Sequence, residues 1–246
     1  MNDKYNMSLK ENIFIAKRMI IDIIWKSANL EGINITFPET YAIYEKAYLD
    51  KANISDVNTI LNLKHAWQIV FSSIEEEIDL EYIKKIHNEV GKDEALEWGV
   101  LRNGTVGISG TDYIPPIPDK GQVEYELQKI KEVESVTERA ITLMMWLMKS
   151  QLFWDGNKRT AMIIANKELI KNGKGIISIP IEKIKEFNEL LSDYYTNDRK
   201  VALQNFIYKY AIYGMDERRT KNKGKILEVW YNQNINFLFW YNILYK

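Results

Sequence analysis

Gln151-Leu152-Phe153-Trp154-Asp155-Gly156-Asn157-Lys158-Arg159-Thr160 is the stretch around which the chain is organised. The apolar run 140–148 precedes it and the run 161–170 follows it, and both have the length and composition of buried helices. The polar residues 155–159 therefore fall in a short loop that opens a helix. The first turn of a helix exposes free backbone N–H groups and the positive end of the helix dipole, which favour an anion. The sequence predicts an anion site at this point.

The residue types in this loop suit a phosphate ligand. Gly156 lets the backbone turn and approach a ligand closely. Asn157 can cap the helix or orient a phosphate oxygen, and Arg159 offers a planar fork of donors. Asp155 supplies a hard oxygen of the kind that Mg²⁺ accepts when it is shared with phosphates. Together these residues indicate a site for a nucleotide diphosphate group.

The stretch resembles the signature loop of the Fic family, whose pattern is His-x-Phe-x-Asp/Glu-Gly-Asn-Gly-Arg-x-x-Arg. The matching positions are Phe153, Asp155, Gly156, Asn157 and Arg159. The form Gly-Asn-Lys-Arg-Thr-Ala also resembles the variant loop of many Fic relatives and of the death-on-curing branch. The resemblance spans residues 80–213 and implies an all-α fold with a short β-hairpin flap next to the loop.

The resemblance also implies a reaction, in which AMP passes from ATP to a hydroxyl side chain of a target protein. ATP and Mg²⁺ are then the expected ligands. The nucleotide would be bound by Gly156, Asn157, Lys158 and Arg159, and the metal by Asp155. The catalytic set would be Gln151, Asp155, Asn157 and Arg159.

Two positions depart from the family pattern. Gln151 stands where the family has its catalytic His, and Met162 stands where it has its second Arg. A glutamine cannot accept a proton near neutral pH, although it can hydrogen-bond a hydroxyl. Because a positioned general base contributes about 10²–10⁴-fold in rate, the sequence predicts reduced or altered activity. His65 and His87 lie far from the loop in sequence and are interpreted as ordinary helix-surface or buried polar residues.

Two other functions stay open beside AMP transfer. A catalytically inactive binding or regulatory module is favoured by the two departures from the pattern. Phosphate transfer, as in the death-on-curing relatives, is the alternative among enzymes.

An N-terminal helix end carries a second motif that matters only beside a Fic-like loop. Ser27 and Glu31 lie four residues apart on one face, and Gly32 can cap the helix. This pattern resembles the family's inhibitory motif, Ser/Thr-x-x-x-Glu-Gly/Asn, whose glutamate pairs with the second Arg and blocks the γ-phosphate. Since that Arg is absent here, Arg159 is the expected partner of Glu31.

Residues 97–118 break the helical pattern with clustered glycines and prolines. The runs 105–108 and 111–114 flank Ser109-Gly110, which predicts a β-hairpin. In the family the equivalent flap follows a Gly-x-x-Arg-like stretch, here residues 99–102, and pairs with an extended piece of the target. The flap residues expected to dock the target are Thr105, Val106, Gly107, Ile108 and Tyr113. A hairpin without a target role is the alternative.

Composition narrows the class of protein. The 246 residues are 46% hydrophobic, carry a formal net charge of −1 and include no Cys. These values disfavour a nucleic-acid partner and exclude disulfides, thiolate catalysis and Cys-metal sites. We expect a cytoplasmic protein without a membrane span, whose partners are a nucleotide, a target protein and, as an open option, further copies of itself.

We expect three regions: residues 1–78 with the inhibitory-type motif, a Fic-like core over 79–213, and residues 214–246 as a charged linker and aromatic tail. The tail 229–245 is interpreted as a helix packed on the core or on a partner, with contact to a membrane surface as the second option. Helices are predicted at 13–30, 38–52, 56–73, 80–90, 119–133, 181–194 and 200–213.

Overall fold

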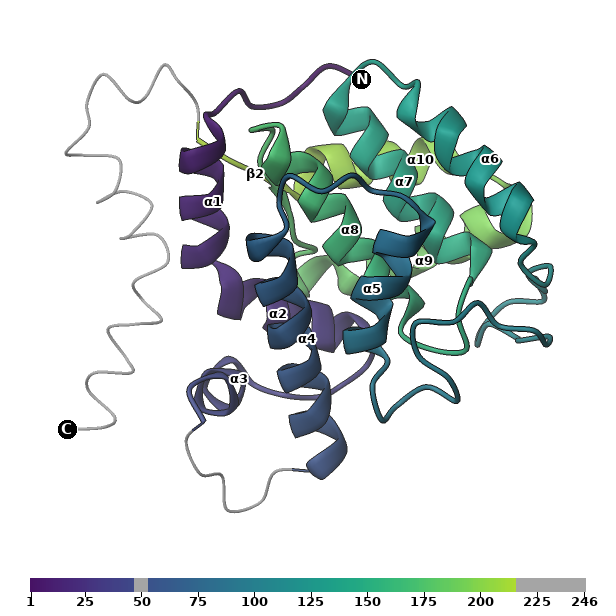
Figure 1. Ribbon diagram of the computed structural model, residues 1–246, viewed down its shortest axis with the longest axis horizontal. Helices are drawn as coiled ribbons and strands as arrows, with labels where there is room; N and C mark the ends of the chain where they lie inside the picture. The colour runs from purple at the N-terminus through teal and green to yellow at the C-terminus, as the bar shows by residue number, and fades with distance from the viewer. Residues whose placement is uncertain (47–52, 216–246) are drawn as a thin grey trace.

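The structure is a computed structural model that describes residues 1–46 and 53–215. Its centre is helix α8 (Asn157–Lys171), of which twelve of the fifteen residues are buried. Helix α7 (Val136–Ser150) packs along α8 and supplies eight further buried residues. Figure 1 shows the other helices arranged around this pair. The two apolar runs that flank the quoted stretch are thus core helices, as the sequence predicts.

The N-terminal half supplies five helices, and one buried cluster of hydrophobic side chains joins them to the central pair. They are α1 (Leu9–Arg18), α2 (Ile20–Leu30), α3 (Phe37–Tyr44), α4 (Ile54–Ser72) and α5 (Leu80–Val90). The prediction of one helix over 13–30 was wrong, because the chain bends at Met19 (φ −95°, ψ 2°). A capping box of Ser8 and Glu11 begins α1 four residues earlier than expected. The division at residue 78 stays a prediction.

The second half surrounds the central pair with three further helices and a small sheet. These elements are α6 (Lys120–Lys131), β1 (Ile176–Ile177), the short 3₁₀ helix η1 (Ile181–Lys183), α9 (Ile184–Asn197), α10 (Lys200–Tyr210) and β2 (Ile212–Tyr213). Strands β1 and β2 pair antiparallel, with Ile176 opposite Tyr213 and Ile177 opposite Ile212. The all-α class is confirmed, since this sheet has only two residues in each strand.

Several predicted boundaries need correction. Helix α3 ends at Tyr44 rather than at residue 52, and residues 47–52 lie outside the described part. Helix α4 is capped by Asn53, whose side chain accepts from the Ser55 N–H, and not by Asp56. Helix α10 ends at Tyr210 because the chain turns into β2. The predicted linker beyond Met215 and the aromatic tail lie outside the described residues.

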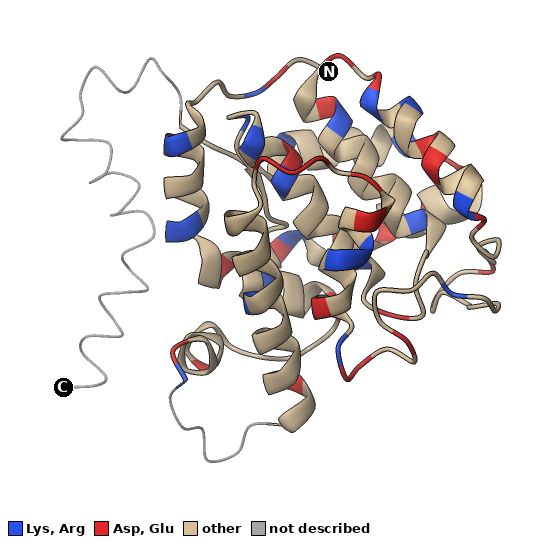
Figure 2. Ribbon diagram, in the orientation of Figure 1, with Lys and Arg blue, Asp and Glu red and all other residues tan. Residues whose placement is uncertain are grey.

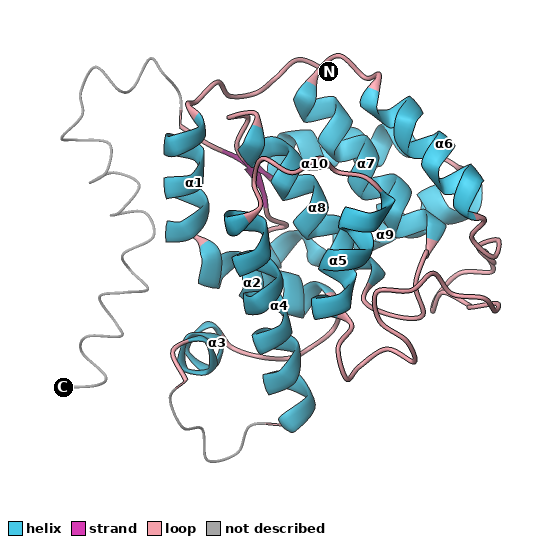
Figure 3. Ribbon diagram, in the orientation of Figure 1, coloured by secondary structure: helices cyan, strands magenta, loops and turns pink. Residues whose placement is uncertain are grey.

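The β-hairpin predicted within residues 105–114 is not formed as paired strands. Figure 3 draws the long connection between α5 and α6 as loop, and the only two-stranded sheet of the described residues is β1–β2. The turn of a hairpin is present, since the Thr111 N–H donates to the Ile108 carbonyl over 3.3 Å. An isolated two-stranded ribbon is marginally stable, and here Gly107 lies in one arm and Pro115 directly follows the other. We call residues 103–117 the flap below.

Charges of both signs alternate along the outer helices, as Figure 2 shows for α6. Helix α6 is exposed on its polar face and buries Val123, Leu127 and Ile130, as the charged pattern of that segment predicts. Over residues 1–46 and 53–215, no helix is both long and apolar enough to cross a bilayer.

Candidate active site

The site loop leaves α7 and enters α8 through two residues with positive φ. Gln151 ends α7 with φ 45° and ψ 58°, and Gly156 precedes α8 with φ 71°. A Cβ on Gly156 would also lie 3.1 Å from Val90 Cγ1, so both backbone conformation and space favour glycine here. This arrangement places residues 155–159 at the start of a core helix, as predicted.

Asn157 holds the loop closed and does not cap the helix. Its Oδ1 accepts from the Phe153 N–H at 3.0 Å, and its Nδ2 donates to the Phe153 carbonyl at 2.8 Å. The residue before the helix, Gly156, has no side chain that could accept from the first turn, and no side-chain cap is formed. The backbone N–H groups at the start of α8 are therefore left for another acceptor.

Gln151 is built into the same network. Its Nε2 donates to the Met148 carbonyl at 2.7 Å, and its Oε1 accepts from Asn157 Nδ2 at 3.1 Å. Both ends of the Gln151 amide are thus engaged with the loop and the end of α7. The side chain is half-buried, and in this conformation it braces Asn157.

His87, on α5, contacts the site loop at Phe153 and Asp155. The sequence did not indicate this contact. The His87 Nδ1 accepts from the Gly99 N–H at 3.0 Å, so Nε2 carries the proton and donates to the Asp155 carbonyl at 2.8 Å. The imidazole stacks on Phe153 with 3.7 Å between ring centroids. Burial lowers the pKa of His87 to about 4. A fully buried imidazole with both nitrogens engaged is a structural support and not a base for an incoming hydroxyl.

The Arg159 guanidinium lies beside the site loop and is surrounded by three carboxylates. Its Nη1 donates to Glu94 Oε2 at 2.6 Å, its Nη2 lies 3.6 Å from Asp155 Oδ1, and its Nε lies 3.9 Å from Glu31 Oε1. Only 4% of the Arg159 side chain is exposed. Glu94 was missed because it belongs to a turn after α5, 65 residues before Arg159, and no local pattern marks it.

Glu31 lies at the start of α8, beside the loop. Its Oε2 is 3.1 Å from Lys158 Nζ, which is closer than its contact with Arg159. Lys158 Nζ also donates to the Leu30 carbonyl at 3.4 Å. The sequence names Arg159 as the expected partner of Glu31; the structure brings the two together but gives Lys158 the shorter distance.

The rest of the inhibitory-type motif positions this carboxylate. Ser27 is buried on α2, Glu31 caps the helix, and Gly32 follows with φ 85°. A positive φ directly after a helix is the usual place for glycine, as the sequence indicates. Within the described part of the chain, the Ser27 side chain makes no hydrogen bond.

Arg102 connects the flap to the site loop. Its Nε donates to the Gln151 carbonyl at 2.5 Å, and its backbone N–H donates to the Leu152 carbonyl at 3.0 Å. Nη1 and Nη2 donate to flap carbonyls at Gly104 (2.5 Å), Pro115 (3.2 Å) and Pro116 (2.5 Å). Burial lowers the pKa of this guanidinium. No carboxylate of the described residues lies within ion-pair distance of it, so neutral carbonyls alone stabilise the charge.

The flap residues predicted to dock a target fall into two groups, one exposed to solvent and one half-buried. Thr105 and Gly107 face solvent, whereas Val106, Ile108 and Tyr113 are half-buried. Tyr113 stacks on Tyr195 of α9 with ring centroids 6.2 Å apart. The inward residues thus anchor the flap to the core.

The indole of Trp154 supports the base of the flap. A Cβ on Gly104 would lie 2.6 Å from the Cη2 atom of Trp154, so the flap backbone passes directly over the ring. The Trp154 Nε1 donates to Glu97 at 3.3 Å. The site loop therefore contacts the flap at Gly104 and the segment before Arg102 at Glu97.

Asp155 is the residue predicted to bind a metal. Its carboxylate is 60% exposed, and Oδ1 accepts from the Gly156 N–H at 2.6 Å. Among the described residues no group of three or more acidic, His or Cys side chains could hold a metal ion. Asp155 therefore fits Mg²⁺ only together with phosphate oxygens and water, which is how this ion is commonly bound.

Comparison with known proteins agrees with this geometry. Residues 77–169 match the family model described as Fic/DOC family. The chain contains a Fic/DOC family domain. It is 29% identical over 180 residues to the "Protein adenylyltransferase Fic" of Nematostella vectensis, with 69% of this chain aligned, and 26% identical over 181 residues to the protein of that name in Drosophila melanogaster, with 68% aligned. The chain covers 42% and 36% of the length of these two relatives.

Solved structures share the fold of the Fic/DOC domain. Fic-1 (residues 134–508) from C. elegans aligns with a TM-score of 0.65 at 21% identity, over 78% of this chain and 60% of that one. A Fic domain-containing signaling protein from Bacteroides thetaiotaomicron aligns with a TM-score of 0.65 at 17% identity, over 82% of this chain and 83% of that one. At these identities the likeness establishes the helical Fic fold.

Proposed function

We propose that the protein binds ATP with Mg²⁺ at the start of α8 and transfers AMP to a hydroxyl side chain of a target protein. The observation that carries this proposal is the uncapped start of α8, where Lys158 and Arg159 already share the carboxylate of Glu31. A carboxylate held by two cations at a helix N-terminus occupies the kind of place that a phosphate takes. The names of the aligned relatives support AMP transfer as the reaction.

Each residue then has a defined task. The backbone N–H groups after Gly156 and the side chains of Lys158 and Arg159 hold the phosphates. The exposed Asp155 carboxylate would hold Mg²⁺, and the ion would neutralise phosphate charge. Four buried polar side-chain atoms of the described residues lack a hydrogen-bond partner, and they belong to Arg159, Thr160, Ser178 and Tyr195. Burial, together with the nearby Glu31 charge, raises the pKa of Tyr195.

Gln151 makes the transfer slow. The target hydroxyl attacks the α-phosphorus of ATP, the bond from that atom to the oxygen bridging to the β-phosphate breaks, and pyrophosphate leaves. The hydroxyl proton goes to solvent or to phosphate, because the amide cannot accept it. Catalysis then depends on positioning and on charge stabilisation by the start of α8 and Arg159. His87 does not replace the missing base, since it is buried and both of its nitrogens are engaged.

Glu31 restrains the site in this proposal. Its carboxylate neutralises Lys158 and lies near Arg159, so a phosphate must displace it. Like charges repel, and the repulsion is stronger for groups with little solvent between them. The side chain of Glu31 is only 17% exposed, which keeps that repulsion effective.

The flap aligns the target. The arms of the flap make no strand pairing with each other, so the backbone groups that Arg102 and the turn do not engage are open to an extended segment of another protein. Arg102 ties both arms to the carbonyl of Gln151, which brings a docked segment close to that position.

The test is label transfer from Mg-ATP carrying the label on the α-phosphate, in cell lysate. We expect labelled protein with the wild-type chain and none with Arg159→Ala. Arg139→Ala is a matched control, because Arg139 is paired with Glu168 in the last turn of α8, whereas Arg159 lies in the first turn. No label from a folded preparation would contradict the proposal.

Two other functions have one supporting observation each. Lys158 in the loop gives the Gly-Asn-Lys-Arg-Thr-Ala form that resembles the death-on-curing branch, so label from the γ-phosphate alone would indicate phosphate transfer. Gln151 is bonded at both ends of its amide, which favours a binding module without transfer. Saturable ATP binding with neither label transferred would support that module.

A further inference from the structure

The three carboxylates around Arg159 do not share it equally. Glu94 lies at hydrogen-bond distance (2.6 Å), whereas Asp155 and Glu31 lie at 3.6 and 3.9 Å. The side chain of Glu94 is 13% exposed and that of Arg159 is 4% exposed. A pair this short and this buried fixes the guanidinium more firmly than the two longer contacts.

The pairing leaves one edge of the guanidinium available. Nη1 is occupied by Glu94, while Nε has no hydrogen-bond partner among the described residues. Nη2 lies 3.7 Å from the position that a Cβ would take on Gly156, so this edge faces the start of α8. Nε and Nη2 together form a fork that matches two oxygens of a phosphate.

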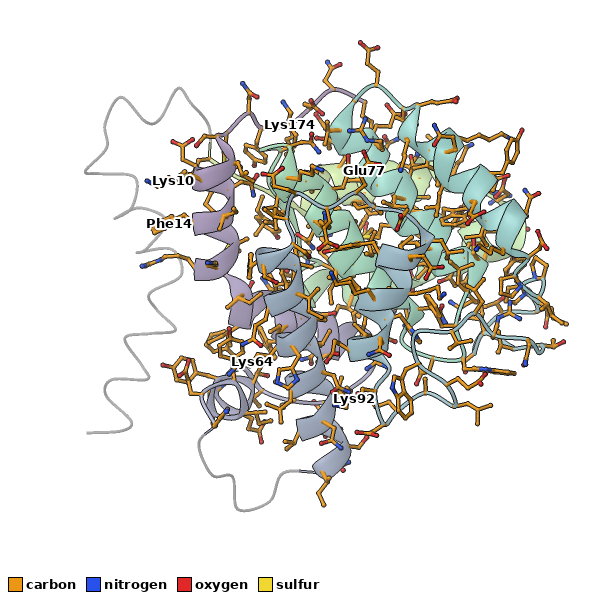
Figure 4. The ribbon with its side chains drawn as sticks, in the orientation of Figure 1. Lys10, Phe14, Lys64, Glu77, Lys92 and Lys174 are labelled. Atoms are coloured by element: carbon orange, nitrogen blue, oxygen red, sulfur yellow. The ribbon has the colours of Figure 1, made fainter. Side chains whose placement is uncertain are left out.

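Glu94 is itself held in place from a third element. Its Oε1 accepts from Asn62 Nδ2 at 3.0 Å, and the same amide donates to the Lys92 carbonyl at 2.7 Å. Figure 4 labels Lys92 in the turn after α5, beside α4, the helix that carries Asn62. One amide therefore fixes both the turn and the Glu94 carboxylate.

We propose that Glu94 is a positioning residue, which holds Arg159 so that its Nε–Nη2 edge faces the phosphates at the start of α8, and that Asn62 holds Glu94. The proposal rests on the proposed function only in taking a phosphate as the ligand. It gives Glu94 a role different from that of Glu31: Glu31 competes with the ligand, whereas Glu94 prepares its binding site.

The direction in which Glu94→Ala changes the affinity for an anion shows whether Glu94 positions Arg159 or acts only through its charge. If Glu94 acted only through its negative charge, Glu94→Ala would bind an anion more tightly, because repulsion is removed. If Glu94 positions Arg159, the same change binds an anion more weakly, since the guanidinium is no longer held at the right angle. Glu94→Gln keeps an oxygen for Arg159 Nη1 and removes the charge, so it should restore binding.

The experiment is calorimetric titration with inorganic pyrophosphate. All variants are made in a Glu31→Ala background, so that the competing carboxylate is absent. The set is Glu94→Ala, Glu94→Gln and Asn62→Ala, and Glu81→Ala is the control because it removes an exposed acid from α5 away from Arg159. Thermal unfolding checks that each variant is folded.

We expect Glu94→Ala to weaken pyrophosphate binding about tenfold, the loss of one charge-assisted hydrogen bond. Asn62→Ala should weaken it less, and Glu94→Gln and Glu81→Ala should bind like the parent or more tightly. Binding by Glu94→Ala as tight as by the parent, or tighter, overturns the proposal, and so does a parent that binds no pyrophosphate. If Glu94→Ala unfolds, weaker binding by Asn62→Ala supports the proposal and unchanged binding overturns it.

Failure of the transferase proposal has a different signature. Suppose that the parent binds pyrophosphate and that the variants rank in affinity as expected, but no label is transferred from ATP. This result contradicts AMP transfer and supports the role of Glu94. Label transfer with unchanged binding by the folded Glu94→Ala variant supports the enzyme and overturns the role of Glu94.

Discussion

The Asn157 side chain donates to the Gln151 side chain over 3.1 Å, and this bond joins the end of α7 to the start of α8. The Gln151 side chain also donates a hydrogen bond to the Met148 carbonyl, and the Asn157 side chain accepts one from the Phe153 N–H. The residue at the family's catalytic position thus stabilises the loop of the proposed anion site. The scaffold of the site is present although the general base is absent.

Gln151→His should raise label transfer from ATP. A base at this position can take the proton of the target hydroxyl, and such a base contributes about 10²–10⁴-fold. Loss of the Oε1 acceptor should cost about 1 kcal/mol of unfolding free energy, the usual value for one hydrogen bond. Initial rates with α-labelled ATP measure the effect.

The matched control for that change is Gln151→Leu, which removes the same hydrogen bonds and supplies no base. We expect it to transfer no faster than the wild type. Equal rates for the histidine and leucine variants would mean that position 151 does not face the acceptor.

His87 should make stability depend on pH. Its pKa is about 4 in the folded state and 6.5 when unperturbed, so below pH 6.5 the unfolded chain binds a proton that the folded chain does not. Stability from this group is complete above pH 6.5 and is lost as the pH falls toward 4. From pH 7 to 5 the loss is about 2 kcal/mol.

Denaturant titrations at pH 7 and pH 5 measure this loss. His87→Gln should be less stable at pH 7, because it disturbs the contacts to Asp155 and Gly99, yet it should lose less stability on acidification. The same pH dependence in the wild type and the variant would contradict the assignment.

Arg102→Lys should loosen the flap while leaving distant helices unchanged. A lysine keeps the charge but cannot reach the four carbonyls that the planar guanidinium binds. The buried carbonyls then lose partners, at a cost of about 1–3 kcal/mol each. Hydrogen exchange should speed up in peptides from residues 103–117 and from the site loop.

Peptides from α10 serve as the internal reference for that experiment, and Asn103→Ala is the control because Asn103 is an exposed neighbour. Unchanged exchange in the flap of Arg102→Lys would show that other contacts, such as the Tyr113–Tyr195 stack, are enough to hold it.

The sequence predicts the start of α8 because both signals are local: two apolar runs and a glycine between polar residues. It also predicts that Glu31 lies near Arg159, although only through the family resemblance. Glu94 and His87 reach the loop from 65 and 68 residues away, so no spacing rule finds them. The prediction of strand pairing within the flap was wrong, because β-favouring residues alone do not stabilise an isolated two-stranded ribbon.

Calorimetric titration with Mg-ATP shows whether Lys158 and Arg159 form a nucleotide site that Glu31 restrains. We expect Glu31→Ala to bind Mg-ATP about tenfold more tightly than the wild type, because one close like charge is removed. Adding Arg159→Ala should abolish that binding, whereas adding Arg139→Ala should not. No saturable binding by folded Glu31→Ala, or binding that survives Arg159→Ala unchanged, would mean that these residues form no such site.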